Sequence, residues 1–194
     1  AVGTASLILS VIVNFFIGFS AGLSVLVSHL YGEKQYDRLS ALVQSIFVTI
    51  LAFAVLFTAA GILLTEHLLT ALSTPAELVP QASLYLRIAL GGMLAQLLYN
   101  TASAILRALG NTTSALHYLA AAVVLNIVLD VLLLFVIPCG IAGAAMATVA
   151  AQYVSALLAL HKLLYLRGAW QLRPHRPFFQ PAHLLPILGT SIPA

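Results

Sequence analysis

Five long apolar stretches constrain this sequence more than any other feature. Each exceeds the about 20 mostly apolar residues that a helix needs to cross a bilayer. They are apolar nearly all round, as buried or lipid-facing helices are, and none shows the ten-residue alternating pattern of a membrane β-barrel strand. We therefore predict an all-α, polytopic transmembrane helix bundle. The predicted spans are Thr4 to Leu30, Leu39 to Leu64, Gln81 to Leu106, Ser114 to Ile137 and Ile141 to about Leu166.

The scarcity of charge excludes most other classes of protein. Only 7% of the residues are charged and 62% are hydrophobic, whereas a soluble domain carries about 25% charged residues. The eight Lys and Arg residues are too few and too scattered for a phosphate-binding face. A soluble enzyme, a disordered tail and a nucleic-acid binder are therefore excluded, and the expected surroundings are a cell (plasma or inner) membrane.

The basic residues predict the orientation of the chain in that membrane. Successive loops alternate between the two sides, and the second and fourth loops, around Pro75 and Cys139, hold no Lys or Arg. Because positive residues concentrate in cytoplasmic loops, the first, third and fifth loops are predicted to be cytoplasmic. These three loops hold seven basic residues, namely Lys34, Arg38, Arg107, Lys162, Arg167, Arg173 and Arg176.

A change in composition divides the chain into three predicted parts. Residues 1–162 form a transmembrane lobe, and residues 163–186, with Trp170, three arginines and four prolines, resemble an interfacial cytoplasmic linker. Residues 187–194 are predicted to begin another transmembrane helix. Because apolar runs are open at both ends, we expect the chain to be a piece of a longer protein.

Asp130 is the one acidic residue that falls deep within a predicted span, where a charge costs about 3 kcal/mol. Asn126 lies one helical turn earlier on the same face. Asp130 and Thr148 are each nine residues from Cys139, so the hairpin is predicted to place them at similar depth. The three side chains offer oxygen ligands to a proton or a small cation. The alternative is that Asp130 only joins two helices through a hydrogen bond to Asn126.

Three other polar residues fall within predicted spans. Arg87 is close enough to the outer surface for its side chain to reach water. Gln96 and Gln152 lie near mid-span, suited either to lining a cavity or to bridging helices. No two histidines share a helix at ligand spacing, so no metal site is expected. Asp130 has no second acid in its span, and His117 lies 13 residues away at the other end of that span, so no catalytic residue is assigned and an enzyme is not expected.

Four segments resemble the multidrug and toxic compound extrusion (MATE) family in the family's order. Residues 18–39 (GFSAGLSVLVSHLYGEKQYDRL) resemble its second helix and the following cytoplasmic loop, and residues 103–116 (SAILRALGNTTSAL) its fourth inner loop region. Residues 125–135 (LNIVLDVLLLF) and 140–152 (GIAGAAMATVAAQ) resemble its fifth and sixth helices. The resemblance implies a twelve-helix transporter of two six-helix lobes. This chain would supply helices two to six, the interlobe linker and the start of helix seven.

The resemblance also implies a function and a site. In relatives, an Asn and an Asp four residues apart on helix five and a Thr on helix six belong to a cation site, and these match Asn126, Asp130 and Thr148. The implied function is efflux of amphipathic, often cationic organic compounds, driven by entry of protons or sodium and without a cofactor. Helix one and the carboxyl-terminal lobe of the same protein would be its structural partners. A flippase for lipid-linked saccharide precursors, from the same superfamily, is the alternative.

Overall fold

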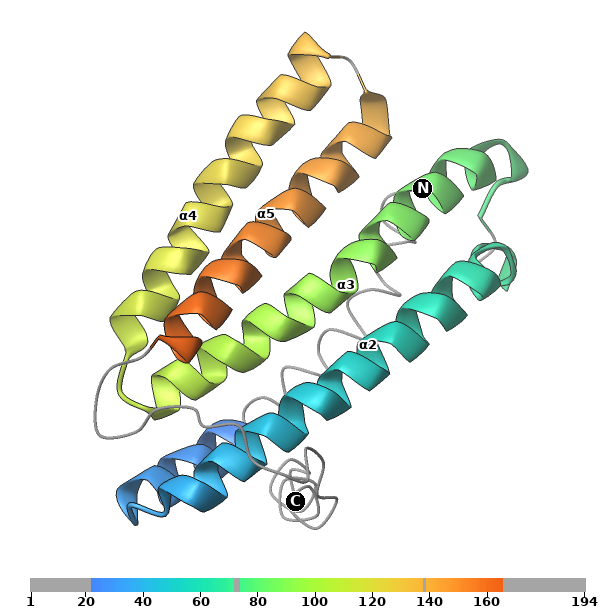
Figure 1. Cartoon of the computed structure of the whole chain (residues 1–194). Helices are drawn as coiled ribbons and strands as arrows, with labels where there is room; N and C mark the ends of the chain where they lie inside the picture. The colour runs from blue at the N-terminus through green and yellow to red at the C-terminus, as the bar shows by residue number, and fades with distance from the viewer. Residues whose placement is uncertain (1–21, 72–73, 138, 166–194) are drawn as a thin grey trace.

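The computed structural model describes residues 22–71, 74–137 and 139–165 of the 194-residue chain. Every regular element in this part of the chain is helical (Figure 1), which confirms the predicted all-α class. Of the short elements, η1 is a 3-10 turn and η2 is a π-helix that continues α4. After a helical segment at 22–32, the elements are α2 (Tyr36–Ala71), η1 (Ala76–Leu78), α3 (Val79–Ala108), α4 (Thr112–Val131), η2 (Leu132–Val136) and α5 (Gly140–Leu164).

Within the described residues, four helices are long and apolar enough to cross a membrane: α2, α3 with η1, α4 with η2, and α5. They correspond to the second to fifth predicted spans. The first predicted span, Thr4 to Leu30, lies within the described residues only from residue 22 onward, where it is helical. The predicted linker beyond Tyr165 and the predicted helix start at 187–194 lie outside the described residues.

Helix α2 is longer than the sequence predicts. Its 36 residues span about 54 Å at 1.5 Å per residue, well beyond the about 30 Å of the hydrocarbon core. The helix therefore extends seven residues past the predicted end of the span at Leu64, and Glu66, which was expected in a loop, lies on the helix. Hydropathy reports burial in lipid, whereas Leu, Ala and Glu residues also favour helix in water, so the helix continues past the end of its apolar run.

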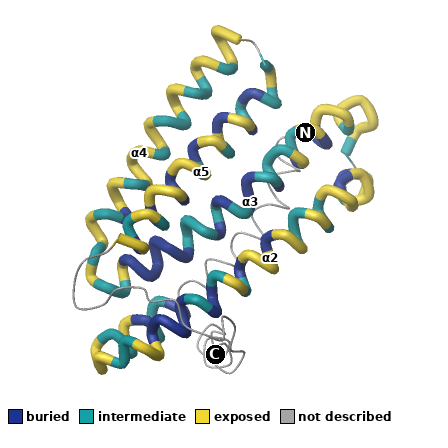
Figure 2. Tube along the Cα trace, in the orientation of Figure 1, coloured by how far each residue is buried: buried dark blue, intermediate teal, exposed yellow. Residues whose placement is uncertain are grey.

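The four long helices are arranged in the order α2, α3, α5, α4. Helix α3 packs against α2 and α5, and α5 packs against α3 and α4 (Figure 1). In the most apolar 18-residue stretch of each membrane-crossing helix, 56% of the residues are buried in the helix that contains α3, whereas none are buried in α4 (Figure 2). Helix α3 is therefore central, and the outer surface of α4 is left to lipid or to further parts of the protein.

The core between α2 and α3 follows from helical spacing. Apolar residues three and four positions apart lie on one face of a helix, and both helices present such a stripe. The hydroxyl of Thr58 on α2 also donates to the carbonyl oxygen of Leu90 on α3 at 3.1 Å. The buried stripes are formed by Leu39, Leu42, Ile46 and Ile50 of α2 and Leu86, Leu90, Met93 and Leu97 of α3.

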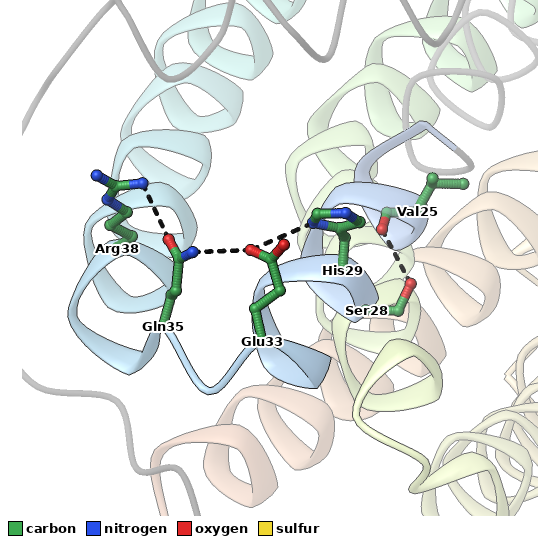
Figure 3. A network of polar contacts seen from close by, with 6 residues as sticks. All are labelled: Val25, Ser28, His29, Glu33, Gln35 and Arg38. Atoms are coloured by element: carbon green, nitrogen blue, oxygen red, sulfur yellow. Dashed lines mark hydrogen bonds and ion pairs between the residues drawn. The ribbon is translucent and has the colours of Figure 1, made fainter.

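A short polar connection joins the segment 22–32 to α2. Gln35 bridges its neighbours, because its Nε2 donates to Glu33 Oε2 at 2.8 Å and its Oε1 accepts from Arg38 at 3.0 Å (Figure 3). The ring of His29 lies 3.6 Å from Glu33 Oε2. The predicted loop between the first two spans is thus a tight turn with its own hydrogen-bond network.

Candidate functional site

Asn126 and Thr148 meet across the α4–α5 interface. Asn126 Nδ2 donates to Thr148 Oγ1 at 3.4 Å, and Thr148 Oγ1 donates to the carbonyl oxygen of Ala144 at 3.0 Å. Asn126 lies 14 residues after Thr112, the first residue of α4, which is about 21 Å along the helix. Because α4 and η2 together have 25 residues, about 37 Å in length, the pair lies in the central part of this membrane-crossing helix.

Asp130 lies one helical turn after Asn126 on α4 and is half-buried. Its Oδ1 atom is buried and accepts no hydrogen bond from the part of the chain that the structure describes. A buried carboxylate without a partner is costly. A bound proton or a small cation would supply the missing partner. Asn126, one turn earlier, and Thr148, to which Asn126 is bonded, also carry oxygen atoms.

The α4–α5 hairpin pairs Thr148 with Asn126, where equal spacing about Cys139 would pair it with Asp130. The connection contains the π-helix η2, in which Ile137 N donates to Leu132 O at 2.9 Å, five residues back. In the turn that follows, Cys139 N donates to Leu133 O, six residues back, at 2.8 Å. A π-helix takes more residues into each turn than an α-helix does, so η2 contributes about one residue to this offset of four residues.

Gln96 and Gln152 bridge α3 and α5. Gln152 Nε2 donates to Gln96 Oε1 at 2.9 Å, and both side chains are partly buried. The phenol of Tyr153 makes a second bond between the same helices, to the carbonyl oxygen of Gly91 at 3.0 Å. Of the two roles expected from the sequence, the structure places these glutamines in the bridging one. Tyr153 was not predicted, although its position directly after Gln152 is visible in the sequence.

Arg87 lies apart from these residues, near the beginning of α3. Its Nη2 lies 3.1 Å from Glu66 Oε1 on α2, and both side chains are largely exposed, at 48% and 69%. That the Arg87 side chain reaches water stays a prediction from the sequence. The ion pair was missed because Glu66 was assigned to a loop.

Polar side chains that lie together at mid-membrane depth are typical of proteins that move ions or solutes across a membrane. The helix bundle defines a polytopic membrane protein. The MatE family model matches residues 1–132 of the chain, and the chain belongs to this family. The resemblance seen in the sequence segments is thereby confirmed.

Two relatives from Bacillus subtilis (strain 168) are similar to the chain. It is 32% identical over 194 residues to the probable multidrug resistance protein YpnP, covering 100% of this chain and 43% of YpnP. It is 31% identical over 160 residues to the probable multidrug resistance protein YoeA, covering 80% of this chain and 34% of YoeA. The chain thus spans less than half the length of the curated relatives that it matches.

Solved structures of the same family have the same fold. A crystal structure of MATE in complex with MaD5 superposes with a TM-score of 0.89 at 24% identity, covering 98% of this chain and 44% of the other. The inward-facing conformation of a multidrug resistance MATE family transporter of the MOP superfamily superposes with a TM-score of 0.85 at 23% identity, covering 93% and 41%. At these identities the likeness concerns the fold alone.

Proposed function

We propose that the chain forms the amino-terminal lobe of a secondary antiporter that exports amphipathic, often cationic organic compounds in exchange for protons or sodium. In this proposal residues 1–162 form the lobe, residues 163–186 link it to a second lobe, and the whole protein lies in the cell membrane. The names of the two multidrug resistance relatives support the substrate class. The proposal involves no cofactor other than the coupling ion.

The observation that carries the proposal is the unpartnered, buried Oδ1 of Asp130 beside the Asn126–Thr148 pair. We assign Asp130 as the residue that exchanges the coupling ion, with Asn126 and Thr148 as neutral ligands. An ion that binds there satisfies the carboxylate, so binding and release are coupled to the packing of α4 against α5.

The flippase alternative is weaker on the same evidence. A cavity for a lipid-linked pyrophosphate is expected to present several free basic side chains. Arg87 is the one arginine within the predicted spans, Lys162 lies at the cytoplasmic end of the last span, and Glu66 lies 3.1 Å from Arg87 at an exposed position. The charge of Arg87 is therefore already balanced, which favours export of amphipathic compounds.

The test is replacement of Asp130 by Asn in the full-length protein, which preserves shape and removes the ionisable group. We expect the variant to reach the membrane and to lose ion-driven efflux of the cationic dye ethidium. Glu77→Gln is the matched control, since it removes an exposed carboxylate from η1 and is expected to leave efflux unchanged. Efflux by Asp130→Asn at the wild-type rate, across a range of sodium concentrations and pH, would overturn the proposed ion site.

A further inference from the structure

Helices α3 and α5 approach closely at one glycine. A Cβ atom added at Gly92 would lie 2.6 Å from Val149 Cγ2 and 2.8 Å from Gln152 Oε1. The α5 surface buried in the bundle is built mostly of alanine, glycine and serine, and such small residues let membrane helices pack closely. Close packing of small side chains has little directional preference, so it does not by itself fix how far α5 slides along α3.

The bond between Gln96 and Gln152, together with the bond from Tyr153 to the Gly91 carbonyl oxygen, fixes the position of α5 along α3. Gln96 lies 12 residues before Ala108, the end of α3, and Gln152 lies 12 residues before Leu164, the end of α5. The two helices run the same way through the bundle (Figure 1), so both amides lie about 18 Å from their helix ends. At that depth lipid offers no substitute partner, and a slide of either helix would break the bond.

Helix α5 carries this effect to the candidate ion site. Thr148 lies one helical turn before Gln152, and α5 packs between α3 and α4 (Figure 1). Gln152 is bonded to α3 while Thr148 is bonded to Asn126 on α4. The position of α5 along α3 therefore sets where the Thr148 hydroxyl stands relative to Asn126 and Asp130.

We propose that Gln96 and Gln152 are positioning residues for ion-coupled transport: their hydrogen bond holds α5 in the register that places Thr148 at the ion site. Neither glutamine touches the ion in this arrangement. The inference rests on the proposed function and adds to it two residues and one helix interface. Gly92 contributes to the same helix register, because its lack of a side chain leaves room for Gln152.

The test measures ion dependence in the full-length protein with Gln96→Leu, Gln152→Leu and the double variant. Ethidium efflux is titrated with sodium at fixed pH and with protons in sodium-free buffer. We expect each single variant to raise the ion concentration for half-maximal efflux about threefold, the worth of an average hydrogen bond between membrane helices. The double variant is expected to match the single variants, because all three remove the same bond.

Two glycine-to-alanine variants test the position of α5 along α3 while both glutamine side chains are kept. Gly92→Ala is expected to shift the ion dependence in the same direction, because its Cβ would collide with Val149 and Gln152. Gly91→Ala is the matched control, because a Cβ at Gly91 meets nothing within 4 Å and the Gly91 carbonyl is retained. We expect Gly91→Ala to behave as the wild type.

Three outcomes would overturn the inference. One is an unchanged ion dependence in the leucine variants while Asp130→Asn abolishes coupling, which leaves the proposed function standing. Another is additive effects of the two glutamine changes, which would mean that they act separately. The third is a loss of ethidium affinity in ion-free detergent as large as the shift in ion dependence, which would indicate general disruption. If Asp130→Asn itself has no effect, the proposed function fails and the inference fails with it.

Discussion

Arg87 of α3 donates to Glu66 of α2 across 3.1 Å, close to the turn that joins these two helices. Both side chains are exposed, and an exposed ion pair contributes about 0.2–1 kcal/mol. The pair joins the part of α2 that extends past its apolar run to the beginning of α3. It therefore joins the two helices at the end of the hairpin.

Reversing one charge of this pair is expected to weaken the hairpin measurably. Glu66→Lys places two cations together and should lower the thermal midpoint in detergent micelles. Adding Arg87→Glu to that variant should restore the midpoint by exchanging the charges. Glu77→Lys is the control, because Glu77 is exposed at the same end and the described residues include no ion-pair partner for it. Equal losses for Glu66→Lys and Glu77→Lys would mean that the pair contributes nothing.

Replacement of Lys34 by glycine is expected to stabilise the folded protein. The φ of Lys34 is +58°, and this residue ends the helical segment 22–32 through bonds from Lys34 N to Tyr31 O at 3.1 Å and from Gln35 N to Leu30 O at 3.0 Å. This is the pattern in which glycine is preferred, because a side chain in that conformation costs about 1 kcal/mol.

Lys34→Gly should therefore raise the thermal midpoint, by an amount corresponding to about 1 kcal/mol. Lys34→Ala serves as the matched control, since it removes the same charge and retains the backbone strain. A rise of similar size in both variants would assign the effect to the charge instead of the backbone.

Two glycines make similar contacts but are expected to respond differently to an added methyl group. A Cβ at Gly143 would lie 2.9 Å from the Leu133 carbonyl oxygen, whereas one at Gly61 would lie 2.8 Å from Cδ1 of Leu90. The carbonyl belongs to the π-helix and cannot rotate away, while the end of a leucine side chain can change rotamer. Gly143→Ala should cost about 1–3 kcal/mol, as overpacking typically does.

Gly61→Ala should cost clearly less, since alanine also favours the helix. Thermal unfolding of the two variants in the same detergent checks the order. Equal destabilisation would show that the π-helix adjusts as readily as a side chain, and that the α4–α5 register is not fixed there.

The sequence predicted the helices but not their ends or their register. Apolar runs longer than a bilayer leave few alternatives to a helix bundle, because lipid requires internally satisfied backbone groups. The extension of α2 to Ala71 was missed, since hydropathy stops reporting where the helix leaves the membrane. The π-helix at 132–136 leaves no mark in hydropathy and was not predicted.

The same limit applies to the polar residues. Asp130 was identifiable because a carboxylate inside an apolar run is costly wherever it packs. That Gln96 pairs with Gln152 depends on α3 and α5 being neighbours, although α4 lies between them in the chain. Hydropathy assigns each helix to the membrane without saying which helices touch. The chemistry of single residues was therefore predictable, and their pairing required the three-dimensional arrangement.

The last prediction concerns the orientation of the helices and uses Cys139, the one cysteine in the sequence. Cys139 is partly exposed in the connection between η2 and α5, a loop predicted to be external because it holds no Lys or Arg. A membrane-impermeant maleimide should therefore label it in intact cells, in a version of the protein whose only cysteine is Cys139. Thr113 is exposed at the other end of α4, on the opposite side of the membrane if α4 spans it. Thr113→Cys in a Cys139→Ser background should react only after the cells are permeabilised. The reverse pattern would invert the orientation, and labelling of both cysteines in intact cells would mean that α4 does not cross the membrane.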